Sequence, residues 1–158
     1  MAYHTRIRSL DGDEAVEEVR KRLMDKDEKS AYAFAKQIGL ESAESDKYLA
    51  LIPLFAELLT EKSSYIRTRA FLLICNQARW AANGQIEAVF DRMVPLLHDT
   101  KPTVVRQCLG ALHEVALFRP EMSECIRKSL AEIDPNQYKD SMAPLIRKDM
   151  DALIAAIL

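Results

Sequence analysis

Glycine is scarce in this sequence, and it has neither a long apolar run nor an excess of charge of one sign. Its 158 residues include four glycines and six prolines, too few for a disordered, collagen-like or low-complexity chain. Scarce glycine also argues against an all-β protein, which uses glycine in its many turns. Because no run of about 18 uncharged apolar residues occurs, we expect no transmembrane helix. The chain, 49% hydrophobic, is long enough to bury the core of one domain without disulfides or a metal.

Charge balance and cysteine spacing exclude further classes of function. The 22 basic and 24 acidic side chains give a net charge of −2, so there is no general attraction to nucleic acid or anionic lipid. The three cysteines, Cys75, Cys108 and Cys125, lie at no zinc-ligand spacing. No apolar stretch follows the basic residues at the N-terminus, which excludes a signal peptide. We therefore expect a cytoplasmic protein with reduced thiols and no metal or cofactor.

Apolar residues recur at helical spacing along most of the chain, and no segment alternates with the two-residue period of a half-buried strand. Capping residues, prolines and an Asn83-Gly84 turn signal divide the pattern into helices. The expected helices cover residues 13–24, 28–39, 46–61, 64–80, 85–99, 103–118, 121–133 and 137–158. We predict one all-α domain over residues 1–158, with eight helices in four antiparallel pairs. Residues 1–10 are expected to be flexible, 11–44 to form a divergent N-terminal pair, and 46–158 to form three further pairs.

The later helix pairs repeat one another. Ile66-Arg67 aligns with Val105-Arg106 at an offset of 39 residues, and a further 33 residues lead to Tyr138-Lys139. A period of this length, built from helix pairs, is typical of an α-solenoid, in which each pair buries its apolar face by stacking on its neighbours.

These residues resemble the HEAT-repeat family. Its helix–turn–helix consensus is similar to PLFAELLTEKSSYIRTRA, with Pro53 inside the first helix and acidic Glu61 before Ile66-Arg67. The next copy, VPLLHDTKPTVVRQCL, departs by placing Asp99 seven positions before its arginine and by shifting the proline to Pro95. The third is weaker, with Asp134 and Lys139 in these places and Pro144 expected to kink its second helix. The resemblance covers about residues 46–158 and is strongest to small, stand-alone bacterial HEAT-like proteins.

A helical wheel for residues 64–80 leaves a strip that we expect to face solvent, formed by Thr68, Cys75 and Arg79. The repeat alignment extends this strip with Gln107, Glu114, Phe118, Asp140, Arg147 and Asp151. The strip is mixed in polarity, as in a groove for a partner protein.

Beside the strip runs a column of cations, Arg67, Arg106 and Lys139. In one interpretation the column binds phosphate or carboxylate groups of a partner. In the other, implied by the HEAT resemblance, Arg67 and Arg106 pair with the turn carboxylates Glu61 and Asp99 and tie the repeats together.

Arg69, Arg79 and Trp80 form a second cluster, of residue types that are favoured as anchors at protein interfaces. Trp80 lies only about 60° from the centre of the core face on the wheel, so packing at the edge of the core is the alternative.

No catalytic motif is present, because the serines, cysteines and lysines lack a nucleophile-elbow, triad or phosphate-loop context. We therefore predict a non-enzymatic protein-interaction or scaffold module that binds a partner protein on its inner helix face, as a monomer or a homodimer joined through the last helix. The candidate binding residues are Arg67, Thr68, Arg69, Arg79, Trp80, Arg106, Gln107, Lys139 and Arg147. The alternative is a nucleic-acid-binding protein like the HEAT-type repair glycosylases, and a lyase or chromophore-handling enzyme has the least support.

Overall fold

Eight α-helices and no strand make up residues 12–157, the part of the chain that the computed structural model describes. The helices are α1 (Asp13–Leu23), α2 (Glu28–Ser42), α3 (Ile52–Leu58), α4 (Ser64–Asn76), α5 (Glu87–Met93), α6 (Pro102–Phe118), α7 (Ser123–Ala131) and α8 (Ala143–Ile157). Short 3-10 helices connect them: η2 (Leu49–Leu51), η3 (Val94–His98), η4 (Pro120–Met122) and η5 (Pro135–Gln137). The all-α class is confirmed, with 74% of the described residues in helices. The expectation of flexibility for residues 1–10 falls outside the described part.

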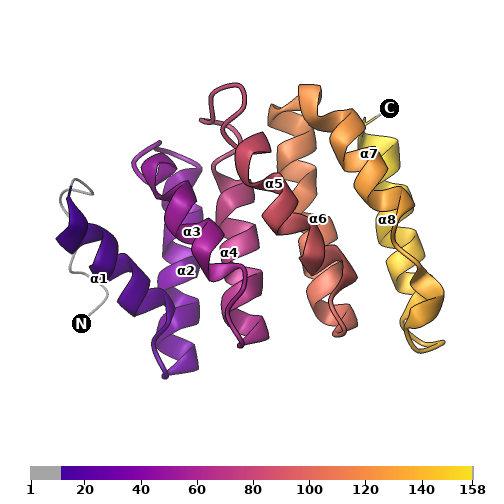
Figure 1. Ribbon diagram of the computed structural model, residues 1–158, viewed down its shortest axis with the longest axis horizontal. Coiled ribbons are helices and arrows are strands. Elements are labelled where there is room, and N and C mark those ends of the chain that lie inside the picture. The colour runs from indigo at the N-terminus through magenta and orange to yellow at the C-terminus, as the bar shows by residue number, and fades with distance from the viewer. Residues whose placement is uncertain (1–11, 158) are drawn as a thin grey trace.

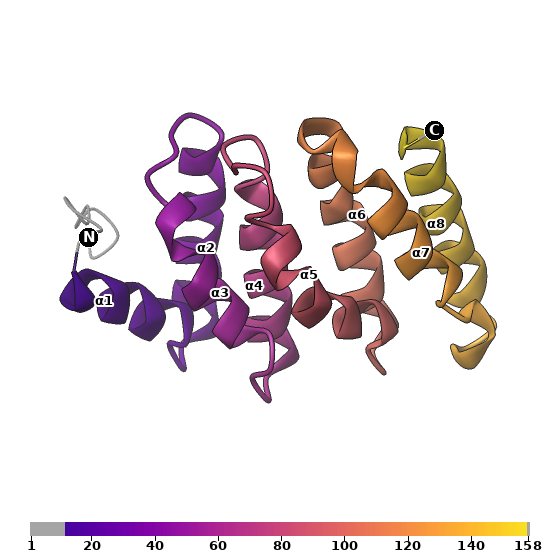
Figure 2. The same ribbon diagram turned by 45° about the horizontal axis from the view of Figure 1, so that its top comes forward.

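The helices form two layers of four (Figure 1). Helices α1, α3, α5 and α7 make one layer, here the outer layer, and α2, α4, α6 and α8 make the other, the inner layer. Helices α1, α3 and α7 each pack on the inner helix that follows them in sequence, and in the third repeat η3, which continues from α5, packs on α6. Along the inner layer α2 packs on α4, α4 on α6 and α6 on α8, so that the pairs stack in sequence order (Figure 2). The four stacked antiparallel pairs that the repeats predict are confirmed.

One apolar core runs between the two layers from α1 to α8. Its largest side chains include Phe55 of α3 and Phe71 of α4, both fully buried. Because each inner helix has another inner helix on one or both sides as well as its outer partner, the core continues through every pair without a break. Each pair over the described residues is therefore buried against its neighbours in one continuous core.

Every proline lies at the first or second position of a helical segment, where its missing N–H leaves no intrahelical bond unmade. Pro53 accordingly is the second residue of α3 instead of lying inside a longer helix 46–61. Pro95 is the second residue of η3, which divides the expected helix 85–99 into two segments. Pro144 lies in the first turn of α8, so the expected kink there is wrong.

Two glycines set local geometry. Gly84 has φ +86°, as the Asn83-Gly84 turn predicts. Gly39, expected to end its helix, instead lies inside α2, which continues to Ser42. A Cβ at Gly39 would lie 3.1 Å from Oδ1 of Asn76 on α4. Gly39 therefore lies at the contact between α2 and α4, where an added methyl group would press on the Asn76 side chain, and not at a helix end.

The register of the last repeat differs from the one expected. Helix α8 begins only at Ala143, so Lys139 lies in the preceding turn and not on a helix. The sequence position that matches Val105-Arg106 is Ile146-Arg147, 41 residues later. Val105 and Ile146 are both fully buried, whereas Leu145, which the 33-residue offset places in the core, is 37% exposed. Arg147 therefore takes the place that we assigned to Lys139.

This register predicts opposite outcomes for two adjacent alanine substitutions. Ile146→Ala removes a buried side chain between α6 and α8 and should lower the free energy of unfolding by about 2–5 kcal/mol. Leu145→Ala, the matched control, should change it by less than about 1 kcal/mol because its side chain is partly in solvent. Urea denaturation followed by circular dichroism measures both. Equal losses, or a larger loss for Leu145→Ala, would show that the 33-residue register is correct.

Candidate functional site

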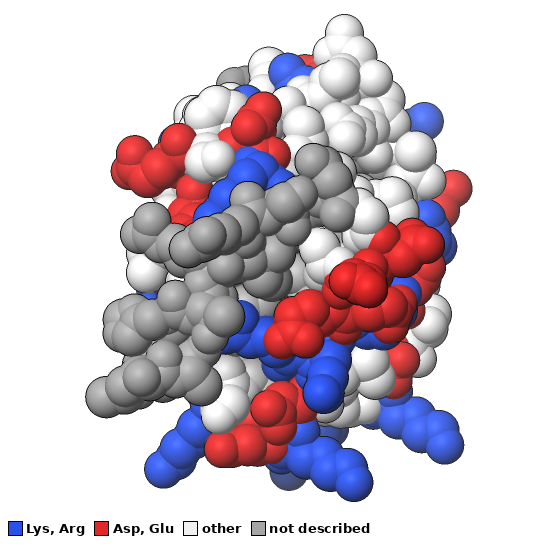
Figure 3. All heavy atoms as spheres, turned by 90° about the vertical axis from the view of Figure 1, so that its left-hand side faces the viewer, with Lys and Arg blue, Asp and Glu red and all other residues white. Residues whose placement is uncertain are grey.

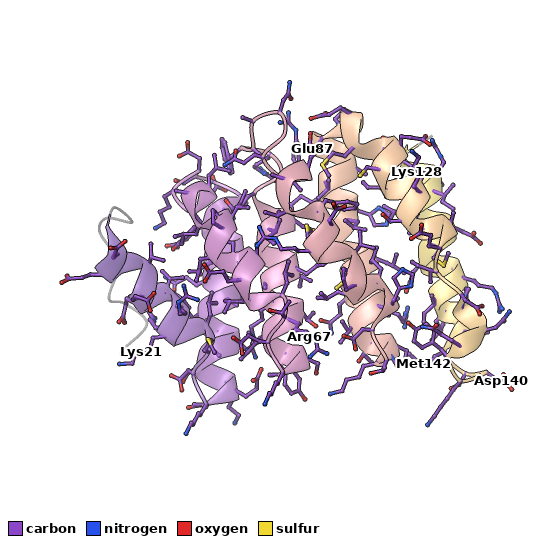
Figure 4. The ribbon with its side chains drawn as sticks, in the orientation of Figure 1. Lys21, Arg67, Glu87, Lys128, Asp140 and Met142 are labelled. Atoms are coloured by element: carbon purple, nitrogen blue, oxygen red, sulfur yellow. The ribbon has the colours of Figure 1, made fainter. Side chains whose placement is uncertain are left out.

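Arg67 ties two repeats together at the N-terminal end of α4. Its Nη1 donates to the carbonyl oxygens of Glu61, at 3.0 Å, and Lys62, at 2.8 Å, and its Nη2 lies 2.8 Å from a carboxylate oxygen of Asp99 in the next repeat. Figure 4 shows Arg67 near the lower end of α4. The tie between repeats is therefore confirmed, but the expected carboxylate partner, Glu61, is wrong.

Arg106 makes the equivalent tie one repeat later. Its Nε lies 2.7 Å from a carboxylate oxygen of Asp149 on α8, and this hydrogen bond raises the pKa of the guanidinium. The expected partner, Asp99, is already bound by Arg67. In the last repeat Arg147 donates to the side chain of Asn136, and Lys139 is exposed in the turn. Arg67 and Arg106 thus link neighbouring repeats through carboxylates, and the third position of the column does not.

Arg79 and Trp80 bind backbone carbonyls at the opposite edge of the stack. Trp80 donates from Nε1 to the carbonyl of Ser42 at 2.6 Å, and Arg79 donates to that of Ala43 at 3.0 Å. The Arg79 guanidinium also lies 4.6 Å from the ring centroid of Phe118 on α6. These carbonyls belong to the C-terminal end of α2, where no intrahelical donor is present. Both side chains are exposed, yet their polar groups are used within the stack.

The strip expected to face solvent from α4 is largely buried. Thr68 is 7% exposed and donates to the carbonyl of Ser64 at 2.7 Å, and Cys75 is fully buried. Burial raises the pKa of the Cys75 thiol, which disfavours the nucleophilic thiolate. Of the three strip residues that the wheel for 64–80 selects, only Arg79, just past the end of α4, is exposed as expected, and on α6 Gln107 is exposed as well. The helical wheel predicts the wrong exposure because it treats α4 alone, whereas α2 and α6 pack on either side of this helix.

A groove crosses three helices of the inner layer. One hollow encloses about 380 Å³ between α2, α4 and α6, and a second of about 270 Å³ continues between α2 and α4. The two hollows share Tyr32, Arg69 and Leu72, so we treat them as one feature, the inner-layer groove. Its other lining residues are Glu28, Lys29, Ala35, Lys36, Gly39, Leu40, Ser64, Tyr65, Thr68, Leu73, Asn76, Thr103, Val104 and Gln107.

Several large, mainly apolar side chains along this groove are exposed to solvent. Tyr32 is 59% exposed, Tyr65 64% and Leu40 66%. An isolated exposed apolar residue is ordinary, but aromatic and aliphatic groups gathered on one hollowed surface are typical of a place where another molecule binds. The inner-layer groove therefore has the apolar walls of a binding site.

A buried cation lies at the centre of the groove, in the wall that both hollows share. Arg69 is only 9% exposed and forms an ion pair through Nη2 with the carboxylate of Glu28, the first residue of α2. Within residues 12–157 its Nη1 is buried and has no hydrogen-bond partner. Burial lowers the pKa of this guanidinium, which reflects the cost of holding the charge there. We expected Arg69 to be an anchor at a protein interface. It is instead buried in the described structure, with a partner for Nη2 and none for Nη1.

Three of the expected binding residues line the groove: Thr68, Arg69 and Gln107. The sequence reasoning missed the main apolar walls, Tyr32 and Tyr65. A signal for Tyr32 was present, since it is an aromatic residue off the apolar stripe of its helix, which consists of Ala31, Phe34, Ala35 and Ile38. An apolar side chain that the stripe does not need to bury is a candidate for a binding surface.

The surface charges do not form a basic stripe. Viewed from the α1 end, acidic and basic groups are interspersed, and Lys and Arg side chains project from the lower edge (Figure 3). Each turn before an inner helix carries an exposed lysine: Lys26, Lys62, Lys101 and Lys139. The same turns carry carboxylates: Asp25, Asp27, Glu61, Asp99, Asp134 and Asp140. The positive potential along this edge is therefore interrupted in every repeat.

Other kinds of site have no support in the described residues. No cluster of three His, Cys, Asp or Glu side chains among them is arranged to hold a metal ion. Across residues 12–157 the helices are all too short or too polar to span a bilayer.

Comparison with known proteins identifies the fold alone. No family model matches the sequence, and no curated protein matches it. Among solved structures, a crystal structure of an engineered protein, a target of the Northeast Structural Genomics Consortium, is similar with a TM-score of 0.52 and 20% sequence identity. The match covers 90% of this chain and 66% of the engineered one, slightly less than two thirds of its length.

The arginine ties predict a graded loss of stability. Arg67→Ala should cost about 1–3 kcal/mol, because it removes the donor of two carbonyls and the cation beside the nearly buried Asp99 carboxylate, which keeps only the backbone N–H of Lys101. Arg106→Ala should cost less, since its pair with Asp149 is more exposed. Arg127→Ala, which breaks a solvent-exposed pair within α7, is the control and should leave the melting temperature nearly unchanged. If Arg67→Ala melted like this control, the column would be free to bind a ligand.

Proposed function

We propose that this chain is a HEAT-like interaction module whose inner-layer groove binds an extended segment of a partner protein. The observation that carries the proposal is the line of exposed apolar side chains, Tyr32, Tyr65 and Leu40, along a groove whose central cation, Arg69, is incompletely paired within the described residues. Apolar walls with one polar group that fixes orientation are the usual composition of a recognition site.

The dimensions of the groove suit a short stretch of extended chain. Packed helices lie about 8–10 Å apart, so α2, α4 and α6 together span about 20 Å. An extended polypeptide advances about 3.4 Å per residue, so about six residues cross all three helices. Alternate side chains of such a segment would face the groove, and the apolar ones would cover Tyr32 and Tyr65.

Binding of nucleic acid has less support from the charges. Arg67 and Arg106, which that hypothesis needs as phosphate ligands, already have carboxylate partners. A phosphate group that binds either arginine would have to displace Asp99 or Asp149, and the displaced carboxylate would then repel the phosphate. The alternative stays a prediction, and binding that weakens steeply with salt would support it.

Alanine at the groove tyrosines should remove partner binding and leave the fold intact. Both side chains are largely exposed, so the double variant Tyr32→Ala/Tyr65→Ala should melt within a few degrees of the parent. A partner co-purified with the parent protein, once purified itself, should bind this variant at least tenfold more weakly in isothermal titration calorimetry, because aromatic anchors carry much of the energy of an interface.

Leu117→Ala supplies the matched control. Leu117 is an exposed apolar residue of α6, at 71%, and it does not line the groove. Its replacement should leave the affinity unchanged. A partner that binds the double tyrosine variant as tightly as the parent, or one lost on Leu117→Ala, would show that the groove is not the binding surface.

A further inference from the structure

We infer that the segment bound in the inner-layer groove carries an acidic side chain, which binds Arg69 in place of Glu28. This inference rests on the proposed function and specifies the partner: a polypeptide with Asp or Glu beside a large apolar residue. Glu28 then acts as an internal substitute for the partner's carboxylate while the groove is empty.

The hydrogen bonding of Arg69 favours an added oxygen ligand. A guanidinium offers five N–H donors in a planar fork that matches the two oxygens of a carboxylate. Glu28 reaches Nη2, whereas Nη1 has no partner within residues 12–157 and is shielded from water. A buried donor left unsatisfied raises the free energy of the unbound protein, and a ligand oxygen at Nη1 would recover this cost.

Glu28 is placed so that it can be exchanged. It is the first residue of α2, and its side chain is 49% exposed although its partner Arg69 is only 10% exposed. When it swings into solvent it stays at the N-terminal end of the helix, where a negative charge is favourable. Releasing Glu28 therefore costs little beyond the ion pair itself, which an incoming carboxylate restores.

The groove walls define what should lie next to the acidic residue. Tyr32 and Leu72 line both hollows together with Arg69, and Tyr65 lines the larger one. A carboxylate on Arg69 would thus have an apolar surface beside it that a Leu, Phe or Tyr side chain can cover. Lys29, also in the larger hollow, adds a second positive charge and disfavours a basic residue there.

A displayed library of random peptides of about twelve residues, long enough to cross the three helices with room at each end, tests this specificity. Selection on the folded protein should enrich peptides with Asp or Glu at one position and a large apolar residue nearby. The most enriched peptide, and the same peptide with its acid replaced by the amide, are then synthesised and titrated against purified variants. The amide peptide should bind the parent protein at least tenfold more weakly.

Two variants at the ion pair distinguish recognition from a structural role. Glu28→Gln removes the internal competitor, so it should tighten the acidic peptide by about two- to fivefold, the scale of a partly exposed ion pair. Arg69→Leu keeps an apolar side chain in the buried position, a replacement that cores commonly tolerate, and should bind the acidic and amide peptides equally. Glu28→Ala with the amide peptide is the control and should show no gain.

The outcomes separate the inference from the proposed function. If peptides are enriched and lost on Tyr65→Ala, but lack an acidic position or bind Glu28→Gln no better, the groove binds a segment and the role of Arg69 is wrong. If no peptide is enriched, or enriched peptides bind Tyr65→Ala unchanged, both proposals fail. An enriched acidic position together with tighter binding by Glu28→Gln supports both.

Discussion

Helix α4 is packed on three sides, by α2, α3 and α6, and most of the structure depends on this constraint. Eight of its thirteen residues are buried, including polar and charged ones. A helix in this position cannot direct a polar side chain sideways without a partner on a neighbouring helix. The Thr68 hydroxyl therefore donates to the carbonyl of Ser64 one turn earlier in α4, and Gln77, just past the helix, donates to the Ser42 hydroxyl of α2 at 3.0 Å. Whether a residue is buried is therefore determined more by the neighbouring helices of the stack than by the position of the residue on a helical wheel.

The same constraint explains why the arginines tie repeats together. Helix ends expose carbonyls that have no intrahelical donor, and in a stack the nearest donors belong to the next repeat. Arg67 serves the turn before α4 and the Asp99 carboxylate, while Arg79 and Trp80 serve the end of α2. Arginine and tryptophan are residue types that are common at protein interfaces, but here their polar groups are used in contacts within the stack. Cationic and aromatic residues at repeat boundaries are thus poor indicators of a binding surface in a solenoid.

The helices and their pairing were predictable because they follow from local signals, whereas the site follows from contacts between repeats. Caps, prolines and apolar periodicity identify eight helices and their order. Pro144 marks the first turn of α8, but the alignment placed the start of this helix before Tyr138-Lys139, which gave the 33-residue offset. The burial of Thr68 and Arg69 depends on α2 and α6, which lie about 35 residues away in sequence, and no wheel drawn for one helix contains them.

Arg69 is one of the buried polar side chains that the stack leaves incompletely paired; among the described residues, the amide oxygen of Gln77 and one carboxylate oxygen of Glu87 also lack a partner. Thr68 and the amide nitrogen of Gln77 find their partners inside the stack, but one nitrogen of this guanidinium stays unpaired within the described residues. A purely structural position would favour an apolar residue here, since a buried ion pair seldom stabilises a fold more than hydrophobic packing does. An arginine in the wall of an apolar groove, held by a glutamate that is half in solvent, fits the binding role that we propose for it. In the proposed function, the stability lost at this position is exchanged for specificity, because a carboxylate on the bound segment pairs with the guanidinium more strongly than a neutral oxygen does.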